Sequence, residues 1–200
     1  SAPEKIKASA GFDAIAQAIE SLISKKSNEK SISFAEKSLN ISLKNFINNL
    51  EKPNLDNTSA MCLAANLAGE AINISKTTAP HAVSYSFTSI YNISHGHAVS
   101  LTLNKFLKYN YKNLSSANCK FDLKQRFQTL FRLTNTEDIS SLDKYLQTLK
   151  QKANLEDDFS KLGIDIKNDY DKIISGVNLM RLSNNPIDLD QNALRNIILN

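Results

Sequence analysis

All three histidines of the 200-residue chain lie in one short stretch, as His81, His95 and His97. Neutral imidazole is the commonest nitrogen ligand for zinc, iron and similar metals, and it titrates close to neutral pH. Gathering every histidine into one segment therefore indicates a metal site or an acid–base site. The alternative is that these histidines are ordinary polar residues beside a turn.

The spacing of His81 and His95 requires a turn between them. Fourteen residues in one helix would separate the two rings by about 21 Å, too far for two ligands of one ion. Residues 86–94 are rich in the β-branched and small polar side chains that are typical of a helix end and a loop. The sequence therefore predicts a helix that contains His81, then a turn, then a second helix that begins at His95.

A carboxylate that could complete a metal site stands near the start of the chain. Asp13 and Gln17 are four residues apart, so a helix over residues 11–24 places them on one face, one turn apart. An aspartate, a side-chain amide and two imidazoles would form a mixed oxygen and nitrogen site. The alternative is that Asp13, Gln17 and Glu20 are only the solvated edge of this helix.

Lys76 and Thr77 directly precede the helix that contains His81. The free N–H groups of a helix N-terminus, together with a nearby lysine, can bind a phosphate or phosphonate oxyanion. The alternative is that Thr77 or Thr78 is merely the N-cap and Lys76 is solvated.

Helical periodicity runs through the chain, whereas alternation of strands with helices is lacking. The fold class that we expect is all-α, a helical bundle. Residues 1–10 are interpreted as a linker or an artificial chain end, and residues 11–200 as one helical metal-binding domain. The expected helices, after the one over 11–24, cover residues 31–50, 58–72, 80–89, 95–109, 122–133, 139–152, 169–180 and 190–199.

Three smaller expectations concern packing. Gly69 interrupts a helical pattern, where it costs about 1 kcal/mol relative to alanine, and this indicates a close helix crossing. Cys62 lies on an apolar stripe and is expected to be buried. Gly96, beside His95, is expected to let the backbone approach the site closely.

Composition bounds the class of protein. A net charge of +4 with no visible basic patch argues against a nucleic-acid partner. No apolar run approaches 20 residues and no secretory signal is visible, so we expect no membrane partner and a cytoplasmic location. Cys62 and Cys119 have no spacing of a disulfide framework.

Three motifs carry a resemblance to a known family. They are Gly-Phe-Asp-Ala-x-x-Gln-Ala-x-Glu from Gly11, Asn-Ile-x-Lys-Thr-Thr-Ala-Pro-His-Ala from Asn73, and His-Gly-His-Ala-Val from His95. The pattern resembles the helical C-terminal half of the iron-containing (group III) alcohol dehydrogenases, and within them most resembles the phosphonoacetaldehyde reductases. The expected fold is therefore the C-terminal metal-binding domain of this family, within the dehydroquinate synthase-like superfamily.

The resemblance implies the metal ligands. Asp13, His81 and His95 match three of the four residues that hold Fe²⁺ in the family, and Zn²⁺ is the alternative ion. Gln17 stands where the broader family has a histidine, and its amide would be a neutral, weaker ligand. Tyr85 stands where many relatives carry another histidine beside the nicotinamide.

The resemblance also implies the reaction. The metal would polarise the carbonyl while NAD(P)H reduces phosphonoacetaldehyde to 2-hydroxyethylphosphonate, with Lys76 and Thr77 binding the phosphonate and His97 or Tyr85 delivering the proton. No glycine-rich dinucleotide fingerprint occurs. The resemblance thus assigns NAD(P)H to an N-terminal domain absent from this chain, and the chain alone is expected to be inactive.

Other functions stay open at this stage. One alternative is half of a dehydroquinate synthase-like lyase, and another is a non-catalytic helical interaction module. The expected partner is a small aldehyde or alcohol substrate, and a homodimer is also open.

Overall fold

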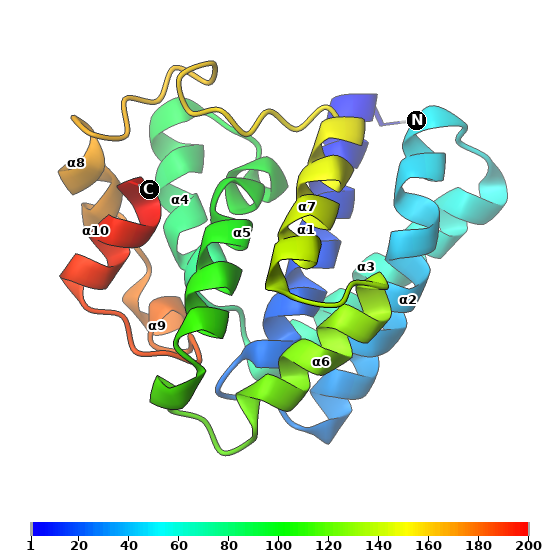
Figure 1. Ribbon diagram of the computed structural model, residues 1–200. Helices are drawn as coiled ribbons and strands as arrows, with labels where there is room; N and C mark the ends of the chain where they lie inside the picture. Colours follow the sequence, from blue (N-terminus) through cyan, green and yellow to red (C-terminus); the bar gives the residue numbers. More distant parts are fainter. Residues whose placement is uncertain (1, 200) are drawn as a thin grey trace.

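The computed structural model describes residues 2–199, and in this part of the chain every regular element longer than an isolated bridge is a helix. Figure 1 shows how the helices are arranged. They are α1 (Glu4–Ile23), α2 (Glu29–Glu51), α3 (Leu55–Ser75), α4 (Ala79–Tyr91), α5 (His95–Lys112), a 3₁₀ turn η1 (Leu114–Ser116), α6 (Leu123–Thr134), α7 (Ile139–Lys152), α8 (Tyr170–Ser175), α9 (Leu179–Leu182) and α10 (Gln191–Leu199). The predicted all-α fold class is confirmed.

The helices pack around two hydrophobic clusters. The first is formed mainly by α1, α2, α3, α6 and α7, and the second by α4, α8 and α10. α5 contributes to both, because Val99 and Leu103 face the first cluster whereas Ala98 and Leu101 face the second. In Figure 1, α5 accordingly stands between the two groups of helices. The helix that begins at His95 is therefore fixed on two sides.

α1 is buried over most of its surface. Phe12, Ile15 and Ile19 are fully buried, and a helix enclosed in this way is held by neighbours on several faces. It packs against α2, α3 and α5. The polar edge that carries Asp13 and Glu20 therefore points into the protein. The alternative, in which this edge is only solvated, required it to point into solvent.

Gly96 permits the contact between α5 and α1. A Cβ atom at this position would lie 2.0 Å from the carbonyl oxygen of Ser9 and 2.8 Å from the Cβ of Asp13. The predicted close backbone approach at Gly96 is confirmed, and it brings His95 toward α1.

The predicted linker over residues 1–10 is wrong for residues 4–10. These residues form the first two turns of α1, and Ala8 and Ser9 are buried. In this helical segment the backbone of Ser9 lies directly against Gly96, a contact that the apolar pattern of the chain does not reveal. Residues 1 and 200 lie outside the described part of the chain.

The helix predicted over residues 169–180 is broken into α8 and α9. Gly176 follows α8, and a Cβ atom there would lie 2.6 Å from Ser86 Oγ. Asn178 then caps α9, since its side chain accepts a hydrogen bond from the N–H of Arg181 at 3.1 Å. The backbone N–H of Asn178 donates to the carbonyl of Ala82 at 3.1 Å, which ties α9 to α4.

Two expectations about α3 are also wrong. Cys62 is exposed. Gly69 has nothing within 4 Å of the position that a Cβ would take, so no close crossing occurs there. Both residues lie beside the buried stripe of α3 rather than on it; Met61, Ala64, Ala68 and Ala71 form that stripe. None of the helices over residues 2–199 is long and apolar enough to pass through a bilayer.

Candidate metal centre

Three side chains from three helices meet at one point. Asp13 of α1, His81 of α4 and His95 of α5 each offer one ligand atom, and these atoms all lie within 4.8 Å of one another. His81 Nε2 and His95 Nε2 lie 3.4 and 3.8 Å from Asp13 Oδ1. His81 is almost fully buried, whereas the His95 side chain is 38% exposed, so the group is accessible from the side of His95.

Two of these atoms are buried without a hydrogen bond. Asp13 Oδ1 and His81 Nε2 have no hydrogen-bond partner in the described part of the chain. Leaving such atoms unsatisfied costs about 1–3 kcal/mol each, so buried polar groups of this kind are usually explained by a ligand or an ion. One carboxylate oxygen and two imidazole nitrogens are ligands that suit iron or zinc. The residues present therefore fit a divalent transition metal.

The turn between α4 and α5 places the two histidines as the sequence predicts. α4 ends at Tyr91, Asn92 adopts the left-handed conformation with φ of 54°, and His95 opens α5. Asparagine tolerates this conformation better than most residues. The reversal of the chain brings the His81 and His95 rings to a centroid distance of 5.3 Å.

Glu20 fixes the orientation of His81, a role that the sequence does not reveal. One oxygen of the fully buried Glu20 accepts a hydrogen bond from His81 Nδ1 at 2.5 Å. The other oxygen accepts from the N–H and the hydroxyl of Thr78, at 2.6 and 2.8 Å. Because Nδ1 donates to this carboxylate, Nε2 is left to face Asp13 and His95. Glu20 is the kind of outer partner that orients ligating histidines in metal sites.

The two histidines have opposite electrostatic environments. Burial alone would lower the pKa of His81, but Glu20 and Asp13 outweigh this effect and raise that pKa to about 9. The pKa of His95 is lowered by burial, and the positive charges of His81 and Arg181 add to this effect against the opposing Asp13. Without a metal, the raised pKa favours a protonated His81 ring beside the Glu20 and Asp13 carboxylates.

Gln17 contacts Asp13 in a way that differs from direct ligation. Its Nε2 donates to Asp13 Oδ2 at 2.7 Å. A carboxylate can only accept, so the amide nitrogen must face it and the amide oxygen points elsewhere. Gln17 thereby holds the Asp13 carboxylate, and its role as a fourth ligand stays a prediction.

Tyr85 lies beside this group of three side chains. Arg181, which the sequence does not single out, lies next to Tyr85. The Tyr85 ring is 5.5 Å from the His95 ring. The Arg181 guanidinium lies over the Tyr85 ring, 5.4 Å from its centroid, and donates a hydrogen bond to Thr77 Oγ1. No spacing rule links Arg181 to the histidine segment, because 104 residues separate it from Thr77.

The two predicted anion-binding residues have different environments. Thr77 is fully buried and contacts Arg181. Lys76 is exposed, with φ of 59°, and its Nζ donates to the carbonyl of Asn73 at 2.7 Å. Thr77 is linked to Arg181, which lies over the Tyr85 ring beside His95. The ammonium of Lys76 is instead hydrogen-bonded to the end of its own helix.

His97, predicted as a proton donor, is not part of the group. It is 6% exposed, and its Nε2 lies 2.7 Å from the carbonyl oxygen of Glu156. The ring therefore holds the segment after α7 against α5. Residues two positions apart on a helix project in different directions, so the step from His95 to His97 explains this separation.

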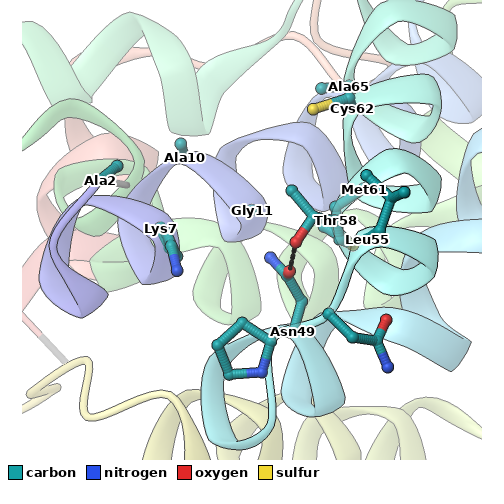
Figure 2. A pocket seen from close by; sticks show the side chains of 12 residues that line it. Ala2, Lys7, Ala10, Gly11, Asn49, Leu55, Thr58, Met61, Cys62 and Ala65 are labelled. Atoms are coloured by element: carbon teal, nitrogen blue, oxygen red, sulfur yellow. Dashed lines mark hydrogen bonds between the residues drawn. The ribbon is translucent and has the colours of Figure 1, made fainter.

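A large groove lies away from these residues. It has a volume of about 690 Å³ and is lined by the start of α1, the α2–α3 connection and α3. Figure 2 shows its lining side chains, with Thr58 Oγ1 hydrogen-bonded to Asn49 Oδ1. None of the eight predicted site residues lines it. Gly11 does, on a different face of α1 from Asp13.

Comparisons with known proteins agree with this arrangement. Residues 7–200 match the model of the Fe-containing alcohol dehydrogenase family, C-terminal. The structure of sulfoacetaldehyde reductase from Bifidobacterium kashiwanohense in complex with NAD⁺ has a TM-score of 0.86 and 26% identity, over 100% of this chain and 50% of that one.

Two curated proteins are also similar. The phosphonoacetaldehyde reductase of Streptomyces viridochromogenes is 40% identical over 52 residues, which are 26% of this chain and 13% of that protein. The 4-hydroxybutyrate dehydrogenase of Clostridium kluyveri is 23% identical over 185 residues, which are 91% of this chain and 49% of that protein.

The chain thus spans about half the length of the sulfoacetaldehyde reductase and of the 4-hydroxybutyrate dehydrogenase. The family match covers nearly the whole chain, including the helices that carry Asp13, His81 and His95. The chain belongs to the iron-containing alcohol dehydrogenase family and corresponds to its C-terminal, all-α domain.

Proposed function

We propose that this chain is the metal-binding half of an NAD(P)H-dependent aldehyde reductase. The observation that carries the proposal is the convergence of Asp13, His81 and His95, with two of their ligand atoms buried and unsatisfied. Fe²⁺ is the proposed metal and Zn²⁺ the alternative. When bound, such an ion supplies a Lewis acid for the carbonyl oxygen.

The residues of the chain have distinct roles in this proposal. Glu20 holds the His81 ring with Nε2 facing the site, and Gln17 holds the Asp13 carboxylate. Tyr85, whose ring lies 5.5 Å from that of His95, would supply the proton to the reduced oxygen of the substrate. NAD(P)H would supply the hydride, and it would be held by a dinucleotide-binding domain in the part of the relatives' length that this chain does not cover. The isolated chain is therefore expected to bind metal but not to turn over.

The substrate class that we propose is a short aldehyde with a negatively charged group. The names of three relatives contain compounds that share one feature: phosphonoacetaldehyde, sulfoacetaldehyde and 4-hydroxybutyrate. Each carries an anion, a phosphonate, sulfonate or carboxylate, at the end remote from the reacting carbon. Phosphonoacetaldehyde, reduced to 2-hydroxyethylphosphonate, is the first substrate to assay.

Metal analysis of the purified chain tests the metal-binding half of the proposal. The chain is expressed and purified under reducing conditions with added iron or zinc. We expect about one equivalent of metal per chain, and loss of that metal in a double Asp13→Ala/His81→Ala variant. The matched control is Glu36→Ala/Lys37→Ala on α2, remote from the site, which should keep the metal.

Two results would count against the proposal. A chain that takes up no metal under these conditions would instead be a helical interaction module. Metal that is retained by the double variant at Asp13 and His81 would belong to another site, and the assignment of these ligands would be wrong.

A further inference from the structure

We propose that Arg181 binds the anionic group of the substrate and so selects aldehydes that carry one. This inference rests on the proposed aldehyde reductase function and extends it to a specificity-determining residue on α9, a helix of only four residues late in the chain. A phosphonate, a sulfonate and a carboxylate share the oxyanion geometry that a guanidinium binds with two parallel hydrogen bonds.

The charge of Arg181 is not neutralised by a neighbouring acid. In the described part of the chain, no carboxylate lies within ion-pair distance of its guanidinium, whereas Arg132 pairs with Glu36. Among the described residues, the guanidinium contacts the neutral hydroxyl of Thr77 and the face of the Tyr85 ring. The remaining guanidinium donors are available to a ligand, since arginine has five.

The backbone around Arg181 is fixed in place on both sides. Asn178, three residues earlier, accepts a hydrogen bond from the N–H of Arg181 and donates to the carbonyl of Ala82 on α4. Asn184, three residues later, is fully enclosed and donates to the carbonyls of Ser75 and Thr77 at 2.8 and 3.0 Å. The short helix is thus tied to the same α3–α4 junction that positions His81.

Tyr85 lies near both Arg181 and the metal-ligand candidate His95. Its ring is 5.4 Å from the guanidinium and 5.5 Å from the His95 ring. A ligand–metal bond is about 2 Å long and a charge-assisted hydrogen bond about 2.8 Å, so the inference requires one short aldehyde to span the space around the Tyr85 ring. Its carbonyl would point toward Asp13 and the histidines, and its anion toward Arg181.

Lys76 is the weaker candidate for this role. Its side chain is exposed and donates to the carbonyl of Asn73, which keeps the ammonium at the end of α3. Thr77 keeps the role that the sequence predicts, but indirectly, because its hydroxyl holds Arg181.

The test compares two aldehydes with the protein in its natural full length, loaded with metal and NAD(P)H. The measured quantity is the ratio of kcat/KM for phosphonoacetaldehyde to kcat/KM for propanal, which lacks the anion. We expect Arg181→Met, which keeps most of the apolar stem, to lower this ratio about 10- to 100-fold, the size of a lost charged hydrogen-bond pair. Arg181→Lys should lower it less.

A matched control is available on α10. The Arg195 guanidinium also lies over a tyrosine ring, 4.7 Å from Tyr170, but it is exposed and remote from the site. Arg195→Met should leave the ratio unchanged. Titration with ethylphosphonate, which has no carbonyl to reduce, provides a readout independent of turnover, and its Kd should weaken at least 10-fold in Arg181→Met.

The outcomes separate the two proposals. A wild-type protein that prefers phosphonoacetaldehyde, with an Arg181→Met variant that keeps the same ratio and the same Kd for ethylphosphonate, would overturn the role of Arg181 alone. A metal-loaded wild type that reduces neither aldehyde would overturn the proposed function and this inference with it.

If Arg181→Met does not fold, Thr77→Val removes the hydroxyl that holds the guanidinium, and a smaller decrease in the same ratio is expected. An unchanged ratio in Thr77→Val would then contradict the inference.

Discussion

Glu20 and His81 form the most enclosed polar pair of the candidate metal centre. The Glu20 side chain is fully buried and that of His81 is 3% exposed. Because Glu20 accepts from Nδ1, it selects the imidazole tautomer whose Nε2 can bind a metal. The centre therefore depends on a carboxylate that would not itself touch the ion.

Replacing Glu20 tests this dependence. Glu20→Gln keeps a polar side chain of the same size but removes the negative charge beside His81. We expect metal affinity to fall about 10- to 100-fold, the usual cost of losing such an outer partner. Competition with a coloured chelator measures the affinity. Glu36→Gln, in a surface ion pair with Arg132, is the control, and equal affinities in the two variants would argue against the role of Glu20.

The raised pKa of His81 predicts a pH dependence for the metal-free chain. The pKa of about 9 in the folded chain exceeds the ordinary value of 6.5, so the protonated ring stabilises the fold. This contribution is complete below about pH 6.5 and is lost as the pH rises through about 9. At about 1.4 kcal/mol per pKa unit, the rise from 6.5 to about 9 amounts to at most about 4 kcal/mol.

Urea unfolding of the chelator-treated chain at pH 7 and pH 10 measures this effect. Other groups titrate in the same range, so the comparison is with His81→Gln, which cannot take up the proton. We expect the free energy of unfolding of wild type to fall more than that of His81→Gln between the two pH values. Parallel changes in both proteins would show that His81 is not protonated in the metal-free chain.

The sequence predicts some of these residues for clear physical reasons. Imidazoles and an aspartate are recognisable as ligands by type, and the turn residues between His81 and His95 show that the chain reverses there. Glu20 is visible only as part of a polar edge, because its burial depends on Thr78 and His81, at the start of α4, lying against it. Arg181 has no local signal, since only the tertiary fold brings it to Thr77.

At the scale of the helices, the contact between α1 and α5 determines the distance between Asp13 and His95. It depends on the missing side chain of Gly96, which leaves room for the backbone of Ser9. Helix ends and short breaks are harder to predict. The stretch over residues 169–180 has helical periodicity, but Asn178 caps a new helix because its side chain satisfies the N–H of Arg181.

Gly96→Ala tests the importance of this contact. The added methyl group would overlap backbone atoms, so α1 and α5 must separate. We expect the free energy of unfolding to fall by about 1–3 kcal/mol or more, together with weaker metal binding. Gly69→Ala is the matched control, a helical glycine with open space around its Cβ position, and should stabilise the chain by up to about 1 kcal/mol. Chemical denaturation measures both, and equal stability of the two variants would contradict the account.

The two wrong predictions about α3, a buried Cys62 and a close helix crossing at Gly69, have a common cause. Its sequence offers more apolar and small residues than its neighbours cover, and Leu63 remains 52% exposed. Periodicity identifies an amphipathic helix, but the stripe that becomes buried is decided by α1 and α2, against which α3 packs. Cys62 and Gly69 therefore lie outside a stripe that the sequence alone defines too broadly.

At the scale of the whole molecule, the candidate metal centre joins helices from both hydrophobic clusters. α1 belongs to the first cluster, α4 to the second, and α5 to both. An ion bound by Asp13, His81 and His95 would therefore link the two halves of the helical domain. The all-α class follows from periodicity, whereas this meeting of the clusters depends on contacts between distant segments.

Metal removal should consequently destabilise the entire chain. A ligand that binds only the folded state stabilises it by about 2.7 kcal/mol at 100 times its Kd. We expect the Tm of the wild-type chain to rise on addition of Fe²⁺ or Zn²⁺ under anaerobic conditions, and to return on chelation. The Tm of Asp13→Ala/His81→Ala should not respond. A metal-induced rise of the same size in this variant would show that the ion acts elsewhere.

The most direct test of the central claim is anomalous diffraction from crystals of the chain grown with Fe²⁺ or Zn²⁺. We predict one strong peak at the absorption edge of the added metal, about 2 Å from the Asp13 carboxylate and from Nε2 of both His81 and His95. Metal bound elsewhere, with no peak among these three side chains, would contradict the account.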